Sequence, residues 1–154
     1  MGRGKIALSR ITVNATPEEV YEKLADLQYW DNMQSGRTVL KGPVGVLHQG
    51  DRITYHSRYA PGPVDGLISE SEKGQTLRWD DRALIGLIHG EHRWLLAKQG
   101  GRRFRLPFMG SASKTQVTLG QEVSGPLSFI IHGDSMEKHG TQWLSDLKLA
   151  CEQK

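Results

Sequence analysis

The sequence predicts an α+β protein in which a curved antiparallel sheet of about seven strands wraps around a long C-terminal helix. Three observations support this fold class. An alternating apolar segment at the N-terminus is followed at once by a helix start. Short runs of β-branched and aromatic residues then recur between turns rich in glycine and proline. After Gly125-Pro126 the apolar spacing becomes that of a helix. With 154 residues, the chain is expected to form one domain over 1–154 that can bury a core or enclose a cavity.

The N-terminal part is expected to form one strand and two short helices. Residues 5–14 alternate in the way of a strand. Thr16 and Pro17, followed by two glutamates, provide an N-cap, a proline at the first helical position and negative charge in the first turn. A second helical turn is expected over 29–34, because Ser35-Gly36 would end it.

The middle of the chain is expected to be an antiparallel meander. Its strands are expected at 37–41, 51–59, 64–72, 76–83, 88–98 and 115–123. The connection from Lys98 to Lys114 is longer than a usual hairpin loop, which predicts either a flexible segment or a lid. The final helix is expected to span about 27 residues, with Gly133 and Gly140 on its packing face. Glycine inside a helix costs about 1 kcal/mol relative to alanine, so either close packing or a bound ligand would explain both residues.

The connection between the strands at 76–83 and 88–98 is unusually apolar. It consists of Ala83-Leu84-Ile85-Gly86-Leu87-Ile88, whereas surface turns are normally built from polar residues, glycine and proline. Such a turn indicates a flap at the mouth of a hydrophobic cavity, and the alternative is a buried corner.

Alternation along the strands places a few polar side chains on otherwise apolar faces. The expected inward sets are Ile53, Tyr55 and Ser57; Leu77, Trp79 and Asp81; Ile88, Gly90, His92, Trp94 and Leu96; and Val117, Leu119, Gln121 and Val123. This composition suits a pocket for an aromatic ligand. The candidate catalytic residues are His92, Asp81 and Tyr55, since a carboxylate can orient an imidazole while the phenol, or Gln121, holds a carbonyl oxygen or an enolate.

The candidate ligand-binding residues are Trp79, Trp94, Gln121, Leu84, Leu87, Met136, Gly140 and Trp143. A structural role is the alternative for several of them. A histidine among apolar neighbours is often a hydrogen-bonded core residue, and the tryptophans can be plain core. His132, Met136, His139 and Trp143 can simply edge the apolar stripe of the last helix.

Several motifs, taken in order, resemble one superfamily. They are the segment Ile11–Tyr21, which contains Ala15-Thr16-Pro17; the block Gly90-Glu91-His92-Arg93-Trp94; Val123-Ser124-Gly125 before the last helix; and the ending Asp146–Glu152. In these motifs the chain is similar to the SRPBCC superfamily, also called START or Bet v 1-like, and to its small polyketide cyclase/dehydrase-like members. The departures are Gln121 where relatives carry Glu, Asp81 where they often carry Gly, and a reduced aromatic motif at Tyr29–Met33.

The resemblance implies the helix-grip fold and an internal cavity for a hydrophobic, aromatic or polyketide-like molecule. It also implies an enzyme that cyclises, dehydrates or rearranges that molecule in secondary metabolism, without a cofactor. The alternatives are a non-catalytic carrier or sensor of a lipid or metabolite, and an interaction module like the Hsp90-activator relatives of the superfamily.

Composition excludes several other classes. The formal net charge of +3 is dispersed apart from Arg102-Arg103-Phe104-Arg105, so nucleic acid is not an expected partner. No apolar run reaches the roughly 18 residues of a membrane span, and no stable membrane association is expected. Cys151 is the only cysteine, which favours a reducing compartment and the cytoplasm. His132 and His139 alone make a weak metal site, so no metal is expected. The chain is expected to be a monomer or a homodimer.

Overall fold

The computed structural model describes residues 5–30, 37–57, 60, 62–99, 113–131 and 133–152. Its elements, with η for a 3-10 turn, are β1 (Lys5–Val13), α1 (Pro17–Ala25), η1 (Leu27–Tyr29), β2 (Arg37–Lys41), β3 (Arg52–Ser57), β4 (Pro63–Glu72), β5 (Thr76–Ala83), β6 (Ile88–Gln99), β7 (Lys114–Ser124), η4 (Ser128–Ile130) and α2 (Gly133–Glu152).

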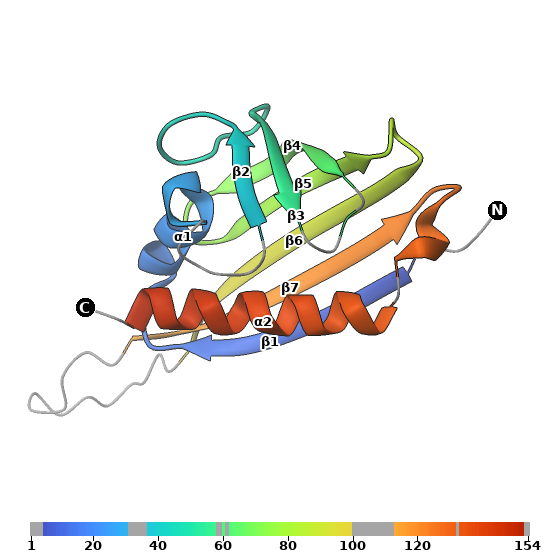
Figure 1. Ribbon diagram of the computed structural model, residues 1–154. Coiled ribbons are helices and arrows are strands. Elements are labelled where there is room, and N and C mark those ends of the chain that lie inside the picture. Colours follow the sequence, from blue (N-terminus) through green and yellow to red (C-terminus); the bar gives the residue numbers. More distant parts are fainter. Residues whose placement is uncertain are drawn as a thin grey trace, which may run out of the picture.

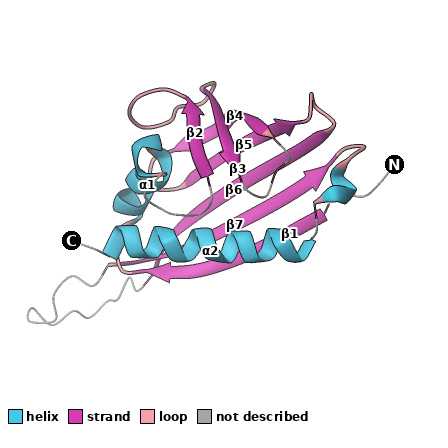
Figure 2. Cartoon of the chain, in the orientation of Figure 1, coloured by secondary structure: helices cyan, strands magenta, loops and turns pink. Residues whose placement is uncertain are grey.

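The seven strands form one antiparallel sheet in the order β1-β7-β6-β5-β4-β3-β2. The sheet is curved, and α2 lies along β1 and β7 (Figure 1). Figure 2 shows both α-helices on the same face of the sheet. This arrangement is the predicted helix-grip fold, so the predicted fold class is confirmed.

The first helix begins where the sequence predicts. Thr16 caps it, since its hydroxyl accepts a hydrogen bond from the backbone N–H of Glu19 at 3.1 Å, and Pro17 is the first helical residue. A 3-10 turn, η1, follows α1, and in it Asp26 accepts a hydrogen bond from the backbone N–H of Gln28 at 3.1 Å. The helical turn expected at 29–34 stays a prediction. Residues 31–36 lie outside the described part of the chain.

The C-terminal helix is shorter than the sequence predicts. It has 20 residues and begins at Gly133, because η4 comes first and Ile131 is extended, with φ −96° and ψ 116°. The segment before it is fixed to the β5–β6 turn by a hydrogen bond from the N–H of Leu127 to the carbonyl of Leu87 at 3.1 Å. That contact holds the chain in a turn where a continuous helix was expected.

The core is built around four tryptophans. The exposed fraction of Trp30, Trp79, Trp94 and Trp143 is 1% or less for each. Trp94 and Trp143 meet edge to face with ring centroids 4.8 Å apart, a favoured aromatic geometry. Leu77 and Trp79 join this core from β5, whereas Asp81 and Ala83, nearer the β5–β6 turn, lie at a cavity.

The predicted strand phases are confirmed. The expected inward residues of β3, β5, β6 and β7 are buried or half-buried. On β6, for example, Trp94 is buried whereas His89, Arg93 and Leu95 are exposed. The polar side chains that alternation placed on inward faces, such as Tyr55, Asp81 and Gln121, therefore do face the interior.

Candidate functional site

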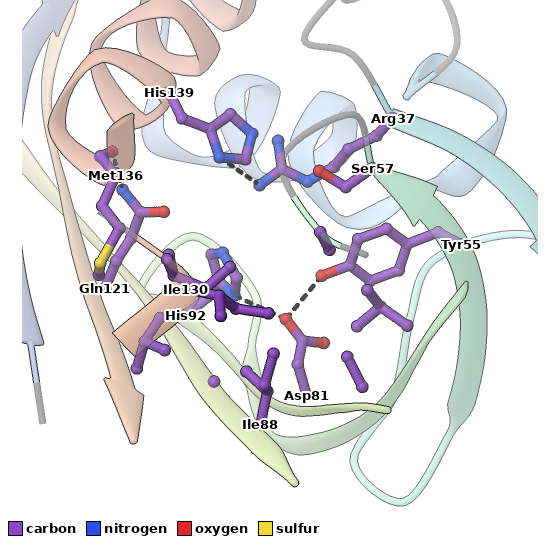
Figure 3. Close-up of a pocket in the computed structure, with 16 residues that line it drawn as sticks. Arg37, Tyr55, Ser57, Asp81, Ile88, His92, Gln121, Ile130, Met136 and His139 are labelled. Carbon is purple, nitrogen blue, oxygen red and sulfur yellow. Dashed lines mark hydrogen bonds and ion pairs between the residues drawn. The ribbon is translucent and has the colours of Figure 1, made fainter. Parts of the chain in front are cut away.

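A cavity of about 310 Å³ lies at the end of the interior nearest the β5–β6 turn (Figure 3). It is lined by Arg37, Tyr55, Ser57, Ala60, Val64, Asp81, Ala83, Ile88, Gly90, His92, Gln121, Val123, Ile130, Ile131, Met136 and His139. Apolar side chains form the larger share of this lining, and five of its seven polar residues fall into two groups, to which Ser57 and Gln121 do not belong.

The first polar group converges on one oxygen of Asp81. Its Oδ2 accepts a hydrogen bond from the Tyr55 hydroxyl at 2.6 Å and another from Trp79 Nε1 at 3.3 Å. The Nδ1 atom of His92 lies 2.9 Å from the same oxygen. Asp81 is 6% exposed, so these contacts, rather than water, stabilise its carboxylate.

Strand pairing brings this group together. Trp79 of β5 is directly opposite His92 of β6, and the two rings stack with centroids 5.0 Å apart. Asp81 pairs with Gly90 on β6 and with Gly66 on β4. Glycine at both positions leaves room for the carboxylate, since a Cβ at Gly66 would lie 3.0 Å from Asp81 Oδ1.

The two ring nitrogens of His92 have different surroundings. Its Nδ1 contacts Asp81, although the N–H bond is not aligned as in a hydrogen bond. Its Nε2 makes no hydrogen bond to the residues that the structure describes, and the side chain, 12% exposed, lies at the cavity wall. An imidazole oriented by a carboxylate in this way can transfer a proton at Nε2.

Tyr55 remains a neutral donor in this setting. Burial is the main reason why its pKa lies well above the usual value, and the charge of Asp81 raises it further. The phenol therefore stays protonated and donates a hydrogen bond to the carboxylate. Its hydroxyl is engaged with Asp81 rather than aimed at a ligand oxygen.

The second polar group, Arg37 and His139, was not among the predicted site residues. Arg37 begins β2 and is 4% exposed, with its guanidinium carbon 3.3 Å from the ring centroid of Trp143. Its Nη2 lies 3.4 Å from Nδ1 of His139. The available signals were the position of Arg37 two residues before the half-buried Val39, and that of His139 one helical turn before Trp143.

The predicted ligand contacts separate into two sets. Gln121 and Met136 line the cavity, and Gln121 Nε2 donates a hydrogen bond to the Met136 carbonyl at 3.0 Å. Its amide oxygen lies on the cavity side in Figure 3. The residues that do not line the cavity are Trp79, Trp94, Trp143, Gly140, Leu84 and Leu87. The tryptophans instead form the core beside the cavity, as the alternative interpretation proposed.

Gly140 has a packing role. A Cβ at this position would lie 2.5 Å from Gln121 Nε2 and 3.1 Å from Ser9 Oγ. The glycine therefore allows α2 to approach β1 and β7 closely, which explains it without a ligand.

The apolar β5–β6 turn is not a flap over the cavity in this structure. Its two ends, Ala83 and Ile88, line the cavity, but Ile85 at the tip is fully exposed. Leu84 and Ile85 have positive φ values of 51° and 58°, so a tight left-handed turn directs the tip away from the interior. The Lys98–Lys114 connection is outside the described residues except at its ends, and the lid hypothesis stays a prediction.

Comparisons of the whole chain address the fold. No protein-family model and no curated protein match the sequence. Among solved structures, an aromatase/cyclase from Streptomyces sp. R1128 has a TM-score of 0.68 at 16% identity, covering 97% of this chain and 94% of that one. Norcoclaurine synthase from Thalictrum flavum, solved with dopamine and hydroxybenzaldehyde, has a TM-score of 0.66 at 11% identity, covering 98% and 88%.

The chain shares the helix-grip fold of the superfamily it resembles. An Aha1 dimer from Colwellia psychrerythraea is similar as well, with a TM-score of 0.65 at 17% identity and 96% coverage of both chains. Enzymes and an Aha1 protein thus share this fold, so the fold alone does not define the activity. No helix in the described part of the chain is long and apolar enough to cross a membrane. In the same residues, no three His, Cys, Asp or Glu side chains form a group that could hold a metal ion.

Proposed function

We propose that the cavity binds a compact hydrophobic molecule, aromatic or polyketide-like, and that the protein catalyses its cyclisation or dehydration by acid/base chemistry. The observation that carries this proposal is the Asp81–His92 contact at 2.9 Å in the wall of a mainly apolar cavity. A cavity of about 310 Å³ is at the small end of ligand sites, which favours a compact ligand over a long lipid chain.

In the proposed reaction, His92 Nε2 removes a proton from a carbon that lies between two carbonyl groups of the substrate. The resulting enolate carbon attacks a second carbonyl carbon of the same molecule, and the imidazolium returns the proton to the alkoxide that forms. A second transfer moves the remaining proton of that carbon to the new hydroxyl group, which leaves as water. Asp81 stabilises the charged imidazolium during both transfers.

The test is the cyclisation of a short poly-β-ketone thioester, followed by the absorbance of the aromatic product. Replacement His92→Gln should lower the rate at least about 100-fold, the lower bound for a lost general base. His89→Gln is the matched control, because His89 lies on the same strand and is exposed. An unchanged rate in His92→Gln would refute the assigned base. Tight binding without turnover by the wild-type protein would instead identify a carrier.

A further inference from the structure

Arg37 places a permanent positive charge at the cavity. Guanidinium groups stay protonated in proteins, and this one is 4% exposed and lines the cavity. Trp143 contacts its face at 3.3 Å from guanidinium carbon to ring centroid, and the Tyr55 ring centroid is 5.9 Å away. Stacking on tryptophan fixes the plane of the guanidinium and therefore the direction of its N–H donors.

His139 adds a ring N–H donor beside this charge. Arginine can only donate hydrogen bonds, so the 3.4 Å contact between Arg37 Nη2 and His139 Nδ1 requires that Nδ1 accept. The ring proton must then lie on Nε2. The His139 ring also stacks on Trp143, with centroids 6.0 Å apart and planes at 14°, so tryptophan orients both groups.

The two polar groups give the cavity opposite electrostatic ends. Figure 3 shows Arg37 and His139 on one side and the Asp81, His92 and Tyr55 group on the other. The remaining lining is mainly apolar, with Val64 and Ile131 among it, and it also includes Ser57 and Gln121. An anionic group near the buried Asp81 carboxylate would be repelled, whereas near Arg37 it would gain charge-assisted hydrogen bonds.

We infer that the cavity selects aromatic ligands that carry an oxyanion, such as a carboxylate, and that Arg37 with His139 forms the subsite for that group. This inference rests on the proposed binding of a small aromatic molecule in the same cavity. The oxyanion at Arg37 orients the ligand so that its other end reaches His92.

The test compares 2-naphthoate with 2-naphthamide by isothermal titration calorimetry at neutral pH. The two probes share a ring system and differ in the charge of one planar group. Hydrogen bonds to charged groups contribute about 1.5–3 kcal/mol, so wild-type protein should bind 2-naphthoate at least about tenfold more tightly than 2-naphthamide. Equal affinities would overturn the inference, even if both probes bind in the cavity.

Variants then show which residues cause the preference for 2-naphthoate over 2-naphthamide. Arg37→Met should reduce it to within about twofold by weakening 2-naphthoate alone, because methionine keeps an apolar contact with Trp143 but carries no charge. His139→Gln should reduce it in part. Arg82→Met is the matched control, since Arg82 is an exposed arginine on β5. A preference that survives in Arg37→Met, or that Arg82→Met abolishes, contradicts the subsite.

The binding measurements also distinguish a failure of the anion subsite from a failure of the proposed function. His92→Gln should leave the preference intact, because the base is not part of the anion subsite. Failure of both probes to bind would overturn the ligand-binding proposal and the subsite together. Binding of 2-naphthamide as tight as that of 2-naphthoate would remove only the subsite. If Arg37→Met does not fold, the wild-type comparison and His139→Gln still decide.

Discussion

Asp81 depends on Tyr55, because a carboxylate that is 6% exposed needs hydrogen-bond donors in place of water. Tyr55 supplies the shortest hydrogen bond to it, at 2.6 Å, while Trp79 and His92 approach the same oxygen at 3.3 and 2.9 Å. The stability of the fold and the chemistry of the cavity therefore share this phenol.

Replacing Tyr55 by Phe tests that dependence. The change removes one donor from a buried charge and should lower the free energy of unfolding by about 1–3 kcal/mol, measured by urea denaturation. Tyr29→Phe is the control, because Tyr29 is half-buried and its ring contact with Lys23 survives without the hydroxyl. A Tyr55→Phe protein as stable as the control would show that the hydrogen bond contributes nothing.

At the residue scale, sequence reasoning could place only the residues that follow a strand period. Alternation put Tyr55, Asp81 and His92 on inward faces, and strand pairing then made them neighbours. Arg37 was missed because a charged residue at the start of a strand is assumed to face water, and His139 because it was interpreted as an edge of the apolar stripe of the last helix. The burial of Arg37 depends on Trp143, a contact between β2 and α2 that local patterns do not contain.

At the element scale, Gly140 sets the distance between α2 and the sheet. Gly140→Ala should destabilise the protein by about 1–3 kcal/mol despite the better helix propensity of alanine, because the new Cβ would displace Gln121 from its bond to the Met136 carbonyl. In a Gln121→Ala background the same change should cost less, because only the approach to Ser9 Oγ at 3.1 Å would remain. Equal costs in both backgrounds, from denaturation of all four proteins, would refute this coupling.

The β5–β6 turn contains strain that can be relieved. Ile85 is fully exposed and has φ 58°, a conformation that costs a β-branched residue about 1–2 kcal/mol. Asparagine tolerates this conformation, so Ile85→Asn should raise the free energy of unfolding by about 1 kcal/mol. Leu87→Asn, made in the same turn at a residue without positive φ, should bring no such gain. A loss of stability in Ile85→Asn would mean that the exposed side chain has a stabilising contact.

Strands were easier to predict than helix ends. The limits of β2 and β5 agree with the expected 37–41 and 76–83, because alternation and turn residues delimit them. The start of α2 was wrong because apolar spacing continues upstream of it. Only the tertiary contact between Leu127 and Leu87 reveals that the chain turns there. Trp79, Trp94 and Trp143 were similarly placed on inward faces, but they were predicted as ligand contacts, whereas they are buried in the core and do not line the cavity.

For the whole molecule, burial of the Cys151 thiol and the Tyr55 phenol should make the free energy of unfolding fall at alkaline pH. Burial raises the pKa of Cys151 from 9.0 to about 12, and it also raises the pKa of Tyr55. The unfolded chain therefore loses these protons first as pH rises, so stability declines from about pH 9 upward. The urea midpoint of Cys151→Ala should fall less steeply between pH 9 and 11 than that of the wild type. Parallel profiles would show that the thiol is not protected by folding.

The central claim is that His92, oriented by Asp81, moves protons on a ligand in the cavity. Its most direct measurement is hydrogen–deuterium exchange at the carbon beside the carbonyl of 2-tetralone in D2O, followed by NMR, because this isolates the proton transfer. The wild-type protein should accelerate exchange above the buffer rate, Asp81→Asn should slow it, and His92→Gln should abolish the acceleration. Asp80→Asn, on the neighbouring residue of β5, should behave as the wild type. Exchange at the buffer rate while the probe is bound, or acceleration that persists in His92→Gln, would contradict the account.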